Sequence, residues 1–100
     1  MADSPSHAWL VDRYPRFEGS YEKLTKKDAR LKAALDKMMD RVEEDPLIGN
    51  PKTGQLRGLR QIHVLDHWVL TWELRPVIVS RKFQNDLREV WFYEIEHHPE

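Results

Sequence analysis

The pattern of apolar residues changes at Pro46, and this change limits the fold more than any other feature of the sequence. Before Pro46, apolar residues recur every three or four positions, which is the spacing of one helical face. The stripe consists of Leu31, Leu35, Met38 and Val42, supported by Ala34 and Met39. Thr25 and Asp28 resemble a capping box, which predicts the start of this helix, and Pro46 ends it. We expect the stripe to be core rather than a cofactor-binding surface.

The second half of the chain is typical of β-strands, because β-branched and aromatic residues predominate there. Strands are expected at residues 59–65, 68–74, 77–80 and 89–95. Asp66 and His67 stand between the first two of these segments and suit a tight hairpin. The Gly- and Pro-containing residues 47–58 are expected to form a turn-rich connection.

The residues before the long helix predict two short elements. Residues 8–14 read as a strand that Pro15 closes, and Phe17, Tyr21 and Leu24 have the spacing of a short helix. Residues 1–7 are expected to be a flexible tail and residues 8–100 a single domain. Two N-terminal helices packed on a small antiparallel sheet make an α+β domain.

Composition excludes several kinds of protein. The 100 residues include no cysteine, which excludes disulfides, thiolate metal sites and a cysteine nucleophile. There is no signal-peptide pattern and no apolar segment near the roughly 20 residues that span a bilayer, so we expect a cytoplasmic protein. The net charge of −1 argues against a general nucleic-acid binder. Any contact with RNA must therefore use locally concentrated positive charge.

Four of the five histidines lie in the strand-rich half, and they are the first candidates for chemistry. They are His63, His67, His97 and His98. Histidine suits acid–base catalysis near neutral pH, and antiparallel strands could bring all four to one edge of the sheet. Each taken singly is more often a solvated turn or tail residue. His63 and His67 also have a spacing that serves zinc on a helix, but they straddle a turn and have no convincing third ligand, so no metal site is expected.

Residues 50–72 carry a specific resemblance. The element Gly58-x-Arg60-x-x-His63-Val64 is followed by Trp68-x-Leu70-x-Trp72. This stretch resembles the YafQ branch of the RelE/ParE toxin superfamily, which reads H-P-L-x-G-x-x-x-G-x-R-x-x-H-V-x-x-D-W-x-L-x-Y here. Residues 43–47 and 92–98 are similar to the family's helix end and to its last strand, F-x-x-I-G-T-H. The resemblance covers most of residues 17–98.

The resemblance implies a fold and an activity. RelE-like toxins pack two N-terminal helices on a small twisted sheet, enter the ribosomal A site and cleave mRNA without a metal or other cofactor. The 2′-hydroxyl attacks the adjacent phosphate and leaves a 2′,3′-cyclic phosphate. A protein antitoxin binds and inhibits such toxins, often in a hetero-oligomer. Phe17, Tyr21 and Trp9 are then either contacts for the antitoxin or ordinary core residues.

The same resemblance assigns roles by position. His63 and His98 match the family's histidines and become the candidate acid–base pair. Arg60 matches a conserved arginine that would suit a phosphate, with Arg57 and Lys52 as further candidates. Trp68 would either stack on a base or belong to the core.

This sequence also departs from the family pattern. The family's leading His falls on Asn50, and the Asp of its D-W pair falls on His67, with Asp66 one position earlier. The acidic role could therefore belong to Asp66, or His67 could replace it. Glu96 and His97 fall on the family's Gly and Thr, and a glutamate there would repel a phosphate. Residues 75–88, with Arg81 and Lys82, form a longer connection than is usual and are either an RNA-facing patch or a solvated hairpin.

Three hypotheses follow. The first is a ribosome-dependent endoribonuclease that uses His63 and His98 with His67 or Asp66. The second is a toxin of the same fold without that chemistry, either directed at gyrase like ParE or limited to binding an antitoxin. The third is an unrelated binding module.

Overall fold

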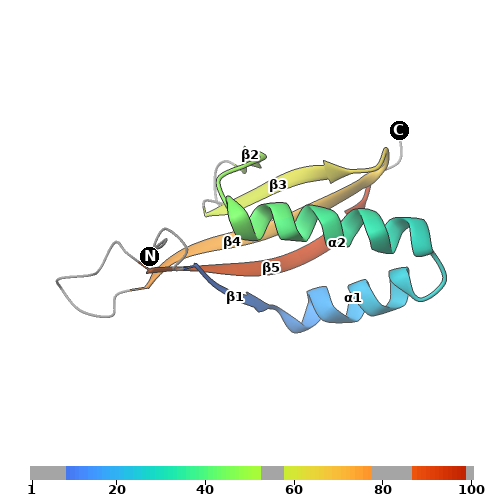
Figure 1. The fold of residues 1–100 in the computed structure, drawn as a ribbon, viewed down its shortest axis with the longest axis horizontal. Helices are drawn as coiled ribbons and strands as arrows, with labels where there is room; N and C mark the ends of the chain where they lie inside the picture. Colours follow the sequence, from blue (N-terminus) through green and yellow to red (C-terminus); the bar gives the residue numbers. More distant parts are fainter. Residues whose placement is uncertain (1–8, 53–57, 78–86, 99–100) are drawn as a thin grey trace, which may run out of the picture.

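The computed structural model describes residues 9–52, 58–77 and 87–98. In chain order the elements are β1 (Trp9–Arg13), α1 (Pro15–Thr25), α2 (Ala29–Glu44), β2 (Asn50–Pro51), β3 (Leu59–Val64), β4 (Trp68–Val77) and β5 (Leu87–His97). The strands form one sheet in the order β1-β5-β4-β3-β2 (Figure 1). The α+β fold with two helices and a sheet is confirmed.

The sheet is mixed rather than wholly antiparallel. β1 runs parallel to β5, with Val11 opposite Val90, and the other three pairs of strands are antiparallel. A parallel pair needs a long crossover connection, and the chain from α1 to β4 supplies it. The expected first strand is therefore present, but the prediction of an antiparallel sheet was wrong for this strand.

The residues at the N-terminal end of each helix explain where that helix begins. Pro15 lies in the first turn of α1, where its missing N–H costs nothing. Asp28 caps α2, because its side chain accepts a hydrogen bond from the Leu31 N–H at 3.0 Å. The prediction of Thr25 as the cap was wrong. Thr25 is the last residue of α1, and its hydroxyl donates to the Tyr21 carbonyl at 2.6 Å.

The strands differ from prediction in two places. β4 is continuous through Arg75 and Pro76, where a break was expected, and its pairing with β5 extends to Val77. A two-residue strand, β2, pairs with β3 inside the predicted connection, with Pro51 opposite Arg60. The turn at Asp66 and His67 was predicted correctly. It begins at Leu65, a non-glycine residue with a positive φ of 56°.

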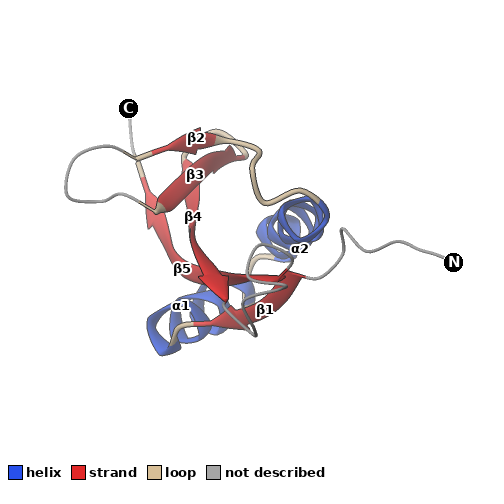
Figure 2. Cartoon of the chain, turned by 90° about the vertical axis from the view of Figure 1, so that its left-hand side faces the viewer, coloured by secondary structure: helices blue, strands red, loops and turns tan. Residues whose placement is uncertain are grey.

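The two faces of the sheet have different surroundings. The inner face packs against both helices and carries Ile62, Val64, Leu70, Trp72, Val90, Phe92 and Ile95. The outer face is opposite and carries Gln61, His63, Val69, Thr71, Glu73, Arg75, Glu89, Trp91, Glu94 and Glu96. Directly opposed residues share a face because side chains alternate along each strand. Strands β2 to β5 curve around α2 (Figure 2).

The core lies between the inner face and the helices. Trp72 is fully buried, and its indole N–H donates to the Pro46 carbonyl at 3.0 Å. Phe17 is also fully buried, with its ring centroid 5.4 Å from that of Phe92. Of the two roles left open for Phe17, core is therefore correct, and half-buried Tyr21 packs beside it. The side chain of Trp9 and the whole predicted tail, residues 1–7, lie outside the described residues.

Candidate functional site

The four histidines of the second half come together at one end of the sheet. Trp68, which follows the β3–β4 turn, is opposite His97 on β5. The backbone N–H of His98 donates to the His67 carbonyl at 2.6 Å, and this bond fixes the end of β5 against the turn. His63 lies one residue before the end of β3. The expected convergence on one edge is therefore observed.

The register separates these residues onto two faces. His63 is opposite Val69 and Val69 is opposite Glu96, which places His63 and Glu96 on the outer face. Nε2 of His98 lies 3.6 Å from a carboxylate oxygen of Glu96, so His98 joins them there. His97 is on the inner side, with its ring centroid 4.8 Å from that of Trp68. His63 and His98 are both exposed.

Two carboxylates accompany His63 and His98 on the outer face. Glu94 lies two residues before Glu96 on β5, and its carboxylate pairs with Arg16 at 3.1 Å. Burial raises the pKa of Glu94, and the negative charge of Glu96 raises it further, while Arg16 opposes both effects. The surface beside the two histidines is therefore acidic.

Thr71 adds a buried polar atom to this face. It lies between Gln61 and Glu94 in the register and is fully buried. Among the described residues, its hydroxyl oxygen has no hydrogen-bond partner. An unpaired buried hydroxyl is costly, so this oxygen marks a place where a neighbouring side chain or a water molecule would be stabilising.

The side chain of Arg60 makes its contacts within the fold. It is opposite Trp72, so it lies on the inner face while His63 lies on the outer. Its guanidinium donates to three backbone carbonyls, those of Ile48 at 3.0 Å, Leu47 at 2.6 Å and Gly49 at 3.1 Å. At Gly49, φ is +77° and a Cβ would overlap a backbone oxygen of β3. Arg60 thus fastens the turn after α2 to β3, and its contact with a phosphate stays a prediction.

The β3–β4 turn faces a hollow shared with the start of α2. Its volume is about 270 Å³, and it is lined by Asp28, Arg30, Leu65, Asp66, His67 and Trp68. Asp66 and His67 are exposed, whereas Trp68 is half-buried and packs against the core. The core role left open for Trp68 is therefore observed, and the part of its surface that remains free faces the hollow.

Of the two remaining phosphate candidates, Lys52 and Arg57, the structure describes only Lys52. Lys52 follows β2 directly, is half-buried, and its backbone N–H donates to the Leu59 carbonyl at 2.8 Å. Arg57 lies outside the described residues, as do Arg81 and Lys82. The roles of Arg57, Arg81 and Lys82 in RNA binding therefore stay predictions, as does that of Lys52.

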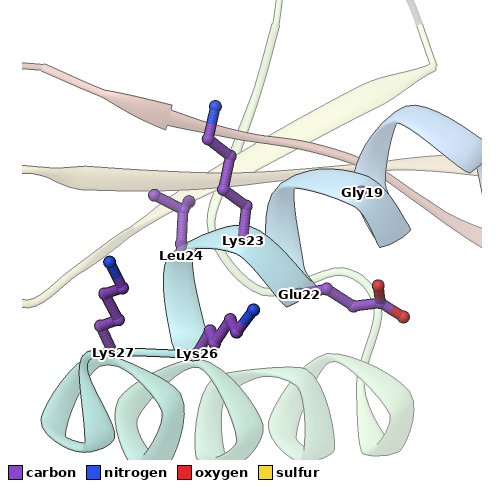
Figure 3. Close-up of a pocket in the computed structure, with 6 residues that line it drawn as sticks. All are labelled: Gly19, Glu22, Lys23, Leu24, Lys26 and Lys27. Atoms are coloured by element: carbon purple, nitrogen blue, oxygen red, sulfur yellow. The ribbon is translucent and has the colours of Figure 1, made fainter.

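Sequence reasoning overlooked a basic corner where α1 meets α2. We define it as Lys23, Lys26, Lys27 and Arg30. The three lysines line an open hollow of about 680 Å³ with Gly19, Glu22 and Leu24 (Figure 3). Lys23 and Lys27 extend in the same direction there. Four cations within eight residues were the available signal in the sequence.

Two kinds of feature are absent from the described residues. Within residues 9–52, 58–77 and 87–98, no three His, Asp or Glu side chains lie close enough to hold a metal ion. Neither described helix has the length and apolar character needed to cross a membrane.

Comparison with solved structures identifies the fold. A YoeB/ParE toxin from Agrobacterium tumefaciens has a TM-score of 0.69 at 13% identity, over 90% of this chain and 99% of that one. The E. coli DinJ–YafQ toxin–antitoxin complex has a TM-score of 0.65 at 16% identity, over 91% and 93%. The RelBE2 toxin–antitoxin complex from Mycobacterium tuberculosis has a TM-score of 0.62 at 16% identity, over 91% and 99%. No protein-family model and no curated protein matches the chain.

These similarities confirm the expected fold, that of the RelE/ParE toxins with YafQ among them. At such low sequence identity they establish the arrangement of helices and strands, while the chemistry must be argued from the side chains.

Proposed function

We propose that this chain, which has the fold of the RelE/ParE toxins, is the toxin of a type II toxin–antitoxin pair and an endoribonuclease that cleaves mRNA on the ribosome. The observation that carries the proposal is the placement of His63 and His98. Both are exposed, both lie on the outer face, and both are at the end of the sheet where the β3–β4 turn meets β5. Metal-independent cleavage of RNA by attack of the 2′-hydroxyl uses a general base and a general acid, and two exposed imidazoles can supply both.

Each of the two histidines carries out one proton transfer of the proposed reaction. One accepts the proton of the 2′-hydroxyl, whose oxygen attacks the adjacent phosphorus. The other donates a proton to the departing 5′-oxygen, and a 2′,3′-cyclic phosphate remains. Glu96, next to the His98 ring, is placed to hold it in position. Asp66 and His67 stand in the neighbouring turn, and either could serve as a further proton carrier.

The basic corner meets the requirement for local positive charge. Arg30 lines the same hollow as Asp66 and His67, so the start of α2 and the β3–β4 turn are neighbours. The α1–α2 connection and the β3–β4 turn lie at the same end of the molecule (Figure 1). An RNA strand held by Lys23 and Lys27 would thus reach the β3–β4 turn, at the end of the sheet where His63 and His98 lie on the outer face. The corner supplies local positive charge despite the net charge of −1.

The test is expression of the chain alone, followed by growth measurement and primer extension on cellular mRNA. We expect growth arrest and discrete in-frame cuts, both lost in His63→Gln and in His98→Gln. His97→Gln is the matched control, because His97 neighbours His98 but lies on the inner side. Cuts that persist in both variants would refute the assigned chemistry.

The same assay tests whether Asp66 or His67, in the β3–β4 turn, takes part in cleavage. If His67 replaces the family's acidic residue, His67→Gln removes cleavage and Asp66→Asn leaves it intact. The reverse result gives the role to Asp66. Equal cleavage by both variants removes the turn from the reaction.

A second candidate is a toxin of this fold that does not cleave RNA, acting on gyrase or binding its antitoxin only. The pair Glu94 and Glu96 favours it, because carboxylates on the same face as His63 and His98 repel a phosphate. In addition, the guanidinium of Arg60 is bound to backbone carbonyls. This candidate predicts growth arrest without mRNA cuts, or a folded protein that causes no arrest.

A further inference from the structure

The β3–β4 turn is strained and firmly held. Leu65, its first residue, has a φ of 56°, which a non-glycine residue rarely adopts. Val64 pairs with Trp68 across the turn. The backbone N–H of His98 donates to the His67 carbonyl at 2.6 Å, which holds the turn from the side of β5. Strained backbone persists where surrounding contacts fix it, and such places are often ligand-binding sites.

This turn forms one wall of the hollow of about 270 Å³, and the start of α2 forms the other. Leu65 is 40% exposed although it is apolar, and the free part of the half-buried Trp68 ring faces the same space. Pockets that enclose a drug-sized ligand begin at about 300 Å³, so this hollow suits a flat group of the size of a nucleobase. Unpaired RNA bases stack on aromatic rings of this kind.

Two charged side chains at the hollow form no ion pair within the described part of the chain. They are Asp66, in the turn, and Arg30, in the first turn of α2. The third charged group, Asp28, is already engaged, because its carboxylate accepts the Leu31 N–H as the cap of α2. Asp66 therefore offers a ligand hydrogen-bond acceptors, and Arg30 offers it donors.

The Asp66 carboxylate would select among the four RNA bases by the donors on their edges. An ionised carboxylate only accepts hydrogen bonds, and two parallel N–H groups bind it best. Guanine has two such neighbouring donors, N1–H and the 2-amino group. Adenine and cytosine place a ring-nitrogen acceptor beside their amino group, and uracil has a carbonyl on each side of its N–H, so these acceptors would repel the carboxylate. Asp66 therefore favours guanine.

A cationic side chain of another protein is the competing occupant, because a guanidinium also stacks on tryptophan and pairs with carboxylates. The charge around the hollow argues against it. Arg30 lines the hollow itself, and Lys26 and Lys27 of the basic corner lie one turn earlier in the chain. These cations repel a guanidinium but attract the phosphate of a nucleotide.

We propose that this hollow binds a guanine of the RNA: the base stacks on Trp68, the Asp66 carboxylate accepts hydrogen bonds from N1–H and the 2-amino group, and Arg30 contacts the phosphate. The inference rests on the proposed function for the source of the nucleotide, an mRNA. In this role Asp66 determines which base is bound and transfers no proton.

The test is an NMR titration of the full ¹⁵N-labelled chain with guanosine 5′-monophosphate (GMP) and related compounds. We expect GMP to shift the Trp68 indole signal and the amide signals of Asp66 and His67. Inosine monophosphate, which lacks only the 2-amino group, should bind about tenfold more weakly, because one hydrogen bond to a charged group is lost. Adenosine monophosphate should leave these signals in place.

Variants at exposed positions separate the two polar contacts. Asp66→Asn should abolish the preference for GMP over inosine monophosphate, whereas Asp40→Asn, exposed on α2 and outside the lining of the hollow, should retain it. Arg30→Gln should weaken GMP binding about tenfold but leave the binding of guanosine, which has no phosphate, unchanged. Arg41→Gln, also exposed on α2, is the control for Arg30.

Three results would overturn the proposal: no shifts at the turn with millimolar GMP, equal binding of the three monophosphates, or an unchanged preference in Asp66→Asn. Tighter binding of arginine amide than of GMP would make a cationic side chain the occupant instead. Shifts confined to the basic corner would reduce the interaction to phosphate binding there. GMP contains no phosphodiester bond to cleave, so the failure of this proposal and that of the nuclease proposal are distinguishable.

Discussion

The two faces of the sheet are held together by different kinds of interaction. The inner face carries most of the fully buried apolar residues of the sheet, such as Leu70, Trp72 and Phe92. On the outer face, the rings of Tyr14 and Trp91 lie 5.1 Å apart, and the guanidinium of Arg75 lies 4.7 Å from the centre of the Trp91 ring. Burial of apolar surface gives stability that salt and pH hardly change, whereas partly exposed ion pairs contribute little. Stability should therefore reside on the inner face, which leaves the outer face free to carry function.

The largest expected effect is that of Trp72→Ala. The change leaves a cavity in the core and removes the hydrogen bond to the Pro46 carbonyl, so it should lower the free energy of unfolding by about 3–5 kcal/mol. Trp91→Ala on the outer face is the matched control and should cost clearly less. Urea denaturation of both variants measures the difference. Equal losses would remove the distinction between the faces.

Arg60 tests a polar residue on the inner face. Arg60→Ala removes three hydrogen bonds to Leu47, Ile48 and Gly49, and we expect a loss of about 2–3 kcal/mol. Arg60→Lys keeps the charge but not the planar group that reaches several carbonyls, so it should lose most of the same stability. Arg41→Ala, exposed on α2, is the control. If Arg60→Lys is as stable as the unchanged chain, the structural role is wrong and the phosphate role gains support.

Arg60 also shows how far the site could be predicted from the sequence. Strand periodicity located β3, and the turn at Asp66 and His67 brought the histidines to one end of the sheet. However, a shift of one residue in register exchanges the two faces of a strand. The motif that joins Arg60 to His63 therefore gave no indication that these side chains lie on opposite faces.

Other departures have equally local causes. Periodicity located α2 but not its cap, because Thr25 and Asp28 both have side chains that cap helices and only the backbone path selects Asp28. The irregularity at Thr71 and Trp72 changes the alternation along β5. Phe92 is opposite Trp72 but Glu94 is opposite Thr71, so Glu94 shares the outer face with Trp91, three residues earlier. The parallel pairing of β1 with β5 depends on contacts distant in sequence, which a reading of neighbouring residues does not include.

A smaller effect is expected for Arg75 on the outer face. Its guanidinium contacts Tyr14, Glu73 and Trp91, but its side chain is 41% exposed. Arg75→Ala should lower the free energy of unfolding by only about 1 kcal/mol or less, since solvent screens these interactions. The loss should also shrink as salt is added. A loss as large as that of Arg60→Ala, or one that salt leaves unchanged, would show that the outer face has a core of its own.

The smallest effect concerns the pH dependence of stability and the Glu94 carboxyl. Burial first, and then Glu96, raises the pKa of Glu94 in the folded protein. The folded state thus binds the proton more tightly than the unfolded state, and protonation stabilises it. This contribution is fully present below the ordinary glutamate pKa and is lost as the pH rises through the raised value.

Glu94→Gln isolates this contribution. At neutral pH the variant should be slightly more stable than the unchanged chain, despite losing the ion pair with Arg16, because an unfavourably placed charge is gone. The advantage should disappear as the pH falls and the native carboxyl becomes protonated. Thermal unfolding from neutral to acidic pH, with Glu18→Gln on α1 as the control, measures it. If Glu94→Gln is less stable at neutral pH, the ion pair with Arg16 outweighs the repulsion from Glu96. In that case the carboxylates beside His63 and His98 contribute to stability, and the acidic character of this face is no argument against RNA cleavage.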